Sequence, residues 1–367
     1  MNSEIMYLTL FISFLLPGIL SAFMPYLTRK TESFGVTITE EIYHSDRMKS
    51  IRKKYSIKAL IVLSLIFFIT SFYFFKFPEP TNIYIYTAGL FVMLIALFFV
   101  YLKFHFLVKN LKEEEGWIEH KKQVSLTDLS FRQRKIKYSN LWFIIPLIIT
   151  IGTMIITYLN YDLIPDSIPM QYDFQGNPNN FKDKSLITVF SPTFIQIMMI
   201  GLFIFINNII SKSKQQLNPS DPEGSALQNE IFRRKWSAFT IVSGILMVLI
   251  FTLMQISFFV IIDPNLIFSA TMIITLMIVI FSLYLAINLG QGGSRIKTES
   301  SGNNTEIDRD QDEYWKLGQF YFNPQDPTVF IEKRFGIGWT INFGSKKGWF
   351  YIGILFAIII FSIFIDF

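Results

Sequence analysis

Cysteine is absent from the 367 residues, and ionisable side chains are scarce. Without cysteine the chain can form neither disulfides nor thiolate metal sites. Only 17% of the residues are charged, below the roughly one quarter found in soluble globular domains. Histidine occurs only at His44, His105 and His120, and neither His-Glu-x-x-His nor Gly-x-Ser-x-Gly is present. The composition therefore disfavours a soluble protein and contains no familiar catalytic motif.

The apolar residues fall in eight long blocks, a pattern typical of a multi-pass membrane protein. A helix of about 20 apolar residues crosses the hydrocarbon core of a bilayer. Apart from Lys58 at the start of the second block, no block contains Asp, Glu, Lys or Arg, which disfavours an ion-coupled pump. The predicted spans are Ile5–Met24, Ile57–Phe75, Ile83–Tyr101, Leu141–Leu159, Ile187–Ile210, Ser237–Ile262, Leu266–Leu289 and Trp349–Ile365.

Lysine and arginine are distributed unevenly between these blocks. Of the 33 basic residues, 30 lie in alternate segments, namely 27–58, 103–140, 211–236 and 290–348. Basic segments of this length stay on the cytoplasmic side of the membrane. We therefore expect an α-helical polytopic protein of the bacterial cytoplasmic membrane, with about eight transmembrane helices and both chain ends outside. The net charge of +5 then reflects membrane orientation and contact with membrane lipids, and we expect no nucleic-acid partner.

Changes of composition divide the chain into six parts. Residues 290–313 are rich in Gly, Ser, Asn and charge and lack the apolar residues of a core, so we expect a disordered cytoplasmic linker. Their Gly-Gln-Gly-Gly-Ser run lacks the ending of a phosphate-binding loop. The predicted parts are an N-terminal three-span unit with basic cytoplasmic loops (1–138), two spans with a Pro-rich outer loop (139–210), a two-span hairpin (211–289), the linker (290–313), a cytoplasmic β-rich domain (314–348) and the last span (349–367).

Short β-prone runs follow the predicted linker. Gln319–Phe322, Thr328–Lys333 and Trp339–Phe343 are separated by Asn-Pro-Gln-Asp-Pro and Gly-Ile-Gly, which indicates a small antiparallel β-meander. Three short strands are only marginally stable alone, so we expect the meander to pack against the membrane face or the 27–58 segment. We also expect it to bind a cytoplasmic partner. The candidate docking residues are Trp315, Asn323, Asp326, Phe335, Gly336, Trp339 and Asn342.

The longest predicted outer segment, residues 160–185, contains three prolines that restrict its backbone. Its acidic and amide side chains offer hydrogen-bond acceptors, but their spacing matches no calcium-binding loop, and we expect no metal or cofactor. Two interpretations remain open: a rigid turn that covers the helix ends, or a surface that recognises a ligand. The candidate ligand-binding residues are Pro165, Asp166, Pro169, Gln171, Asp173, Gln175, Gly176 and Asn177.

Two stretches resemble known bacterial sequences. Leu163-Ile-Pro-Asp-Ser-Ile-Pro, followed by Asp173-Phe-Gln-Gly-Asn-Pro and Lys184, resembles the short conserved domain of SdpI-like membrane proteins, with Gln171 where the family pattern has His. The segment from Tyr314 onward resembles an uncharacterised domain of longer Firmicutes members. The resemblance implies a membrane immunity protein that acts against a secreted peptide toxin and also holds a transcriptional repressor at the membrane.

We therefore expect a non-enzymatic immunity or signalling protein that senses or neutralises an extracellular peptide or envelope component. Its partners would be membrane lipids, a secreted peptide outside, and a regulator or transporter subunit inside. An accessory subunit of a membrane transport system is the alternative. A membrane enzyme is the least favoured interpretation, because an acid–base site would have to come from loop carboxylates alone.

Overall fold

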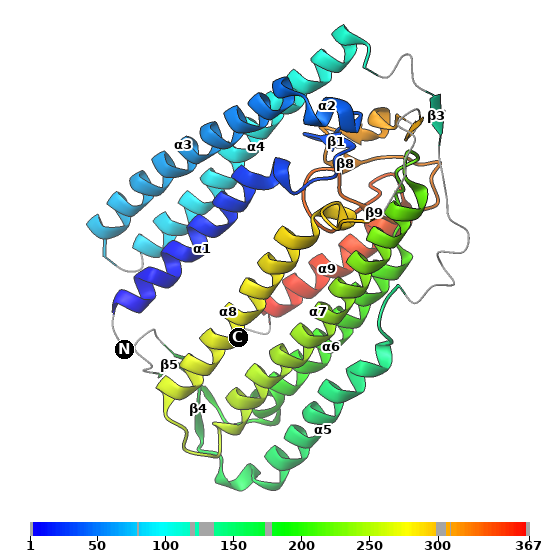
Figure 1. Ribbon diagram of the computed structural model, residues 1–367. Coiled ribbons are helices and arrows are strands. Elements are labelled where there is room, and N and C mark those ends of the chain that lie inside the picture. The colour runs from blue at the N-terminus through cyan, green and yellow to red at the C-terminus, as the bar shows by residue number, and fades with distance from the viewer. Residues whose placement is uncertain are drawn as a thin grey trace.

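Long helices cover most of each apolar block in the computed structural model, which describes residues 3–78, 81–117, 122–124, 136–172, 178–298, 306–308 and 310–364 (Figure 1). The block predicted to end at Ile262 is helical only up to Ile256. Within the described residues, six helices are long and apolar enough to cross a membrane, so the chain is a helical multi-pass membrane protein. These six are α3 (Asp46–Lys76), α4 (Thr81–Glu115), α5 (Ile144–Leu159, extended by a 3₁₀ turn from Asn140), α6 (Leu186–Lys212), α7 (Pro222–Ile256) and α8 (Pro264–Leu289). The first and last blocks lie on α1 (Ser3–Phe23) and α9 (Lys346–Phe364).

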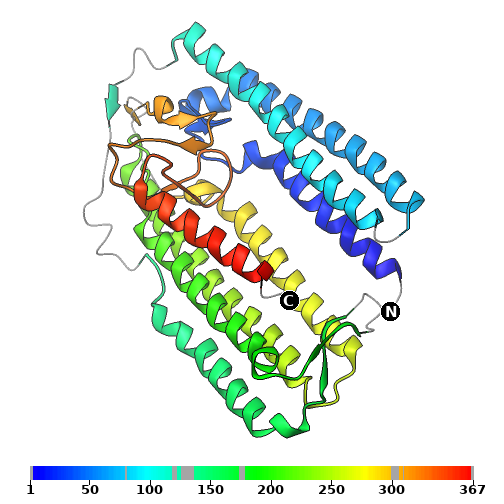
Figure 2. The same ribbon diagram turned by 180° about the vertical axis from the view of Figure 1, so that it is seen from behind.

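The helices form two groups that lie apart over most of their length and come together at one end (Figures 1 and 2). In the N-terminal group α3 packs on α4 and α1, and in the C-terminal group α7 packs on α6, α5 and α8. Helices α3 and α4 approach closely because Gly89 faces Thr70: a Cβ added at Gly89 would lie 2.3 Å from the Thr70 hydroxyl. Small residues at such contacts are typical of helix packing in membranes.

Several helices begin at a capping side chain that the sequence places just before the apolar run. Ser45 accepts a hydrogen bond from the backbone of Met48 at the start of α3, and Ser185 does the same at the start of α6. Asp221 and Asp263 cap α7 and α8, and each is followed by a proline. These caps satisfy backbone N–H groups that a helix cannot satisfy itself, so they define where the helices start.

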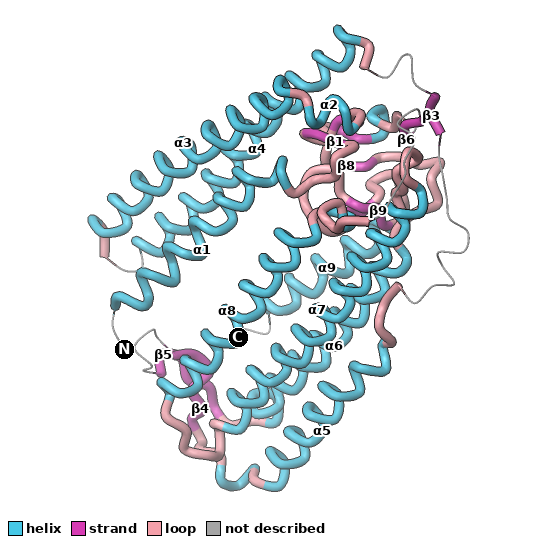
Figure 3. Tube along the Cα trace, in the orientation of Figure 1, coloured by secondary structure: helices cyan, strands magenta, loops and turns pink. Residues whose placement is uncertain are grey.

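The strands lie at opposite ends of the helices (Figure 3). One hairpin, β4 (Ser167–Tyr172) with β5 (Pro178–Asp183), connects α5 to α6. At the other end lie β1 (Glu32–Ser33), β2 (Val36–Thr37), β7 (Trp315–Lys316), β8 (Phe320–Tyr321), β9 (Phe330–Glu332) and β10 (Trp339–Ile341), together with the parallel pair β3 (Lys122–Val124) and β6 (Glu306–Asp308).

The predicted β-meander is two hairpins instead of one three-stranded sheet. Strand β9 pairs with β10 as expected, but β8 pairs with β7, a strand that the sequence did not predict. Pro324 and Pro327 lie between β8 and β9, and proline cannot donate a ladder hydrogen bond. The segment between the two hairpins is held by side-chain bonds instead, as described below.

Residues 290–298 differ from the disordered linker that the sequence predicts; residues 299–305 and 309 lie outside the described part of the chain. Gln291 is fully buried, and its side-chain amide exchanges hydrogen bonds of 2.9 and 2.7 Å with the backbone of Gly338. Gly293 has a φ of +84°, and a Cβ there would lie 2.3 Å from the Gln228 carbonyl oxygen. Glycines thus let this segment pack tightly without large apolar side chains.

Candidate functional site

The hairpin between α5 and α6, β4 and β5 with their flanking residues 160–166 and 184–185, is called the outer hairpin because the sequence predicts it on the outer side; it is anchored by an apolar root. Its strands pair from Ser167 with Asp183 to Tyr172 with Pro178, with irregular register after Pro169. The inward-facing apolar side chains meet the start of α6 and the segment after α7. This cluster contains Ile164, Ile168, Met170, Val189 and Phe258.

Lys184 fixes the entry to the hairpin. Its backbone N–H donates to the carbonyl of Asp166 at 2.8 Å, and its ammonium group donates to the carbonyl of Ile164 at 2.8 Å. The same ammonium lies 4.7 Å from the centre of the Tyr161 ring. The sequence singled out Lys184 only through the family resemblance. Its contacts assign it a structural role, that of bracing a proline-containing turn.

The outer residues predicted to bind a ligand lie together on this hairpin where the structure describes them. Pro165 and Asp166 are exposed immediately before β4, Pro169 is half-buried within it, and Gln171 lies in its irregular part. The other four, Asp173, Gln175, Gly176 and Asn177, lie outside the described residues.

The exposed surface of the outer hairpin combines acidic and apolar side chains. Asp166 and Asp183 are exposed, and Phe181 is 53% exposed on β5. Leu163, before β4, is 67% exposed, and Ile261, in the segment after α7 that packs against the hairpin, is fully exposed. Such a surface offers both charge and apolar contact to a molecule that carries positive charge and an apolar face.

The junction, defined as segments 24–45, 214–221, 290–298 and 310–345, lies at the opposite end and joins the two helix groups. Asn342 organises its C-terminal part: its amide nitrogen donates to the carbonyls of Asn323, Asp326 and Thr328. Its amide oxygen accepts from the backbone of Asn323 at 3.0 Å. Asn342 is fully buried, so these bonds replace the strand pairing that the prolines prevent.

Asp326 ties this segment to the end of α6. It accepts from the ammonium of Lys214 at 2.7 Å and from the hydroxyl of Tyr321 at 2.9 Å. Burial raises the pKa of Asp326, but the hydrogen bonds from Lys214 and Thr328 outweigh that effect and lower the pKa to about 2. The carboxylate is therefore ionised at neutral pH and acts as an internal acceptor.

A buried ionic cluster lies in the centre of the junction. Glu332 on β9 pairs with Arg233 on α7 at 2.7 Å, and both side chains are fully buried. Arg29, which comes from the N-terminal group, also pairs with Glu332. Asn229 bridges the pair, because its oxygen accepts from Arg233 and its amide nitrogen donates to Glu332. One carboxylate thus connects elements from both helix groups.

Asp312 centres a second ionic contact between the groups. It pairs with Arg334 and, at 2.6 Å, with Lys112 near the end of α4, and it accepts a 2.8 Å bond from the Thr37 hydroxyl. Burial raises the pKa of Asp312, but the neighbouring charges of Arg334 and Lys112 outweigh it and hold the pKa well below its ordinary value.

The aromatic residues predicted to dock a partner make internal contacts in the structure. Phe335 packs on Tyr101 with ring centres 4.3 Å apart and stacks on Phe34, so this segment does contact residues 27–58. Trp315 is 3% exposed, and Trp339 packs on α7. Gly336, with a φ of +114°, allows the turn between β9 and β10.

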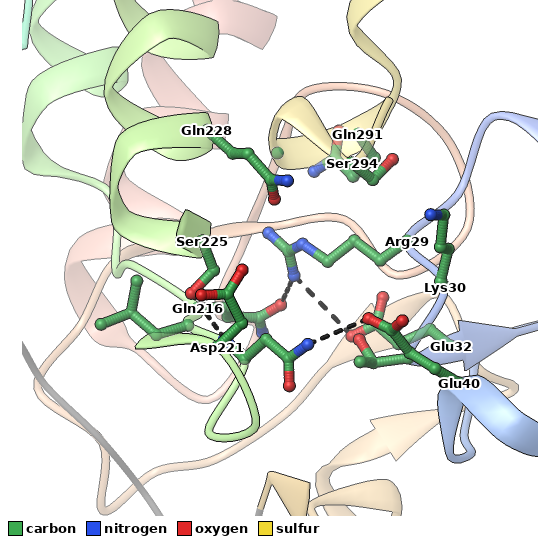
Figure 4. Close-up of a pocket in the computed structure, with 14 residues that line it drawn as sticks. Arg29, Lys30, Glu32, Glu40, Gln216, Asp221, Ser225, Gln228, Gln291 and Ser294 are labelled. Carbon is green, nitrogen blue, oxygen red and sulfur yellow. Dashed lines mark hydrogen bonds and ion pairs between the residues drawn. The ribbon is translucent and has the colours of Figure 1, made fainter. Parts of the chain in front are cut away.

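A small polar pocket opens beside the ionic cluster (Figure 4). Its volume is about 90 Å³, room for a few water molecules. Arg29 projects into it, and Asn218 donates to Glu40 across it at 3.0 Å. The lining combines both charge signs with amides. Among the described residues, no group of three or more His, Asp or Glu side chains could hold a metal ion.

The sequence did not reveal Arg233, Glu332, Arg29 or Asp312 as a connected set. Their partners are far apart along the chain: Arg233 and Glu332 are separated by 99 positions. The only local signal is the four-residue spacing of Asn229 and Arg233, which puts both on one face of α7.

Two family models match parts of the chain. Residues 148–197, which include the outer hairpin, match a domain of unknown function (DUF1648), and residues 324–349, within and just after the junction, match a family of unknown function (DUF5808). No curated protein and no solved structure matches. The chain thus contains two uncharacterised domains, one at the outer hairpin and one at the junction.

Proposed function

We propose that this is a non-enzymatic immunity or signalling protein whose outer hairpin recognises a cationic, amphipathic peptide outside the cell. The observation that carries the proposal is the division of the hairpin into a buried apolar root and an exposed surface with carboxylates and apolar side chains. A hairpin held this way loses little conformational freedom when a ligand binds.

The proposal includes eight spans, with both chain ends and the outer hairpin outside the cytoplasm. It is supported by the charge distribution: 30 of the 33 basic residues lie in four alternate segments of the sequence, and the described parts of these segments lie on the junction side. The resemblance of the hairpin segment to SdpI-like proteins supports an immunity role. A regulator inside the cell would bind residues 314–348 through side chains that the internal contacts leave exposed, such as Phe322.

The test compares Asp166→Asn and Phe181→Ala with the wild type in cells challenged by a cationic amphipathic peptide. Because both side chains are exposed, we expect normal membrane abundance and a clear loss of protection. Asp46→Asn is the matched control, since Asp46 is an exposed carboxylate at the other end of the helices. If protection falls only in proportion to abundance, the hairpin is a structural cover and the recognition role is wrong.

A further inference from the structure

Arg52, on α3, is a buried cation without a carboxylate partner among the described residues. It is 4% exposed, donates to the carbonyl of Tyr43 at 2.9 Å, and lies 4.0 Å from the centre of the Tyr43 ring. No described group accepts a hydrogen bond from its Nε or Nη1 atoms. This differs from Arg233 and Arg334, which are equally buried and are each paired with a carboxylate. A buried arginine without a carboxylate beside it favours the binding of an anion.

A second arginine lies nearby on the other helix group. Arg295, just after α8, donates to the carbonyl of Tyr26 at 3.0 Å and is exposed. The Tyr26 ring lies 5.9 Å from the Arg52 guanidinium. Among the described residues, no ion pair is formed by Arg295. Two guanidinium groups that form no ion pair within the described chain therefore both contact Tyr26, where the two helix groups meet.

Apolar surface extends from this arginine pair along the helices. Tyr26 follows α1 and Arg295 follows α8, and these are neighbouring helices of the two groups (Figures 1 and 2). Phe23 on α1 is 45% exposed, and Ile287 on α8 is 49% exposed. The most apolar part of α8 has no buried residue. Positive charge at the end of an exposed apolar face matches a molecule with an anionic head and long hydrocarbon chains.

We propose that Arg52 and Arg295 form a binding site for the phosphate of an anionic membrane phospholipid, whose acyl chains cover the facing surfaces of α1 and α8. Arg295 contacts the phosphate directly, and Arg52 attracts it from the protein interior. Guanidinium groups suit this role because they bind phosphate oxygens with two parallel hydrogen bonds and remain charged when buried. The bound lipid then links the two helix groups and neutralises Arg52.

The experiment measures the thermal stability of the purified full-length protein in detergent, with added phosphatidylglycerol, phosphatidylcholine or inorganic phosphate. We expect phosphatidylglycerol to raise the melting temperature more than phosphatidylcholine does. Arg295→Gln should weaken phosphatidylglycerol binding by about tenfold, the loss of one charge-assisted contact. Lys297→Gln, an exposed charge change two residues away, should keep the wild-type response.

Arg52→Gln supplies a second test, in which the lipid-free protein should lose no stability. Because it removes a buried charge without a partner, we expect the lipid-free variant to be at least as stable as the lipid-free wild type, and to lose the phosphatidylglycerol response. Equal stabilisation by phosphatidylcholine, or by inorganic phosphate alone, would overturn the proposal. So would an equal loss in Arg295→Gln and Lys297→Gln, since the effect would then come from overall surface charge.

Discussion

The outer hairpin and the junction use charge in opposite ways. The hairpin is anchored by apolar side chains and backbone bonds, and Asp166 and Asp183 remain exposed. The junction buries its charges, with Glu332 and Arg233 fully inside. An exposed carboxylate contributes little to stability, whereas a buried pair that loses one partner leaves an uncompensated charge. Charge is thus available for binding on the hairpin, whereas in the ionic cluster of the junction it is committed to assembly.

The largest effect is expected at Glu332. Glu332→Ala leaves Arg233 and Arg29 without their shared carboxylate and should reduce the free energy of unfolding by about 3–5 kcal/mol. Thermal unfolding in detergent measures the change. Glu313→Ala, an exposed carboxylate in the same part of the chain, is the control and should change stability by less than about 0.5 kcal/mol. Equal stability of the two variants would show that the ionic cluster does not join the helix groups.

A smaller loss is expected at Trp339, which packs on Phe232 with ring centres 5.6 Å apart. Trp339→Ala should cost about 3 kcal/mol, because it leaves a cavity between β10 and α7. Limited proteolysis of residues 310–345 reports the loosening. Lys346→Ala, at an exposed position, should be as resistant as the wild type, and equal susceptibility of both variants would contradict the packing.

Acid should weaken the junction through Asp326. Its folded-state pKa of about 2 is below the ordinary value of 3.8, so its contribution is present above about pH 4 and is lost as the pH falls toward 2. We expect the unfolding free energy of the wild type to fall by about 1 kcal/mol more over this range than that of Asp326→Asn. Denaturant titrations at several pH values measure the difference. If the unfolding free energies of the two proteins change in parallel with pH, Asp326 does not contribute to the acid response.

Cysteine labelling sharpens the comparison without disturbing either region. Because the chain contains no cysteine, Ser167→Cys in the hairpin and Ser50→Cys near the junction each introduce one thiol at an exposed position. With an impermeant maleimide on intact cells, only Ser167→Cys should be labelled, and neither change should alter stability by more than about 0.5 kcal/mol. The reverse order would invert the proposed orientation.

The helices were predictable because each apolar block is long and uninterrupted. Ile83–Tyr101, for example, lies within α4, and the structure extends that helix through the polar residues up to Glu115. Strands β9 and β10 also lie where β-prone runs and turn residues predict them. The pairing of β8 with β7 was not predictable, since short strands can exchange partners without any change in local pattern. The buried turn at Gln291 was missed because amide hydrogen bonds, not apolar residues, hold it.

The sequence by itself determined the membrane class, the helix positions and the uneven distribution of basic residues, because these depend on local composition and on the thickness of the bilayer. Only the tertiary structure decided that Arg29, Arg233 and Glu332 meet, and that Arg52 has no carboxylate beside it among the described residues. Whether a charge is paired or left for a ligand depends on groups brought together from distant parts of the chain. Composition and residue spacing do not show which distant residues lie close together in the folded chain.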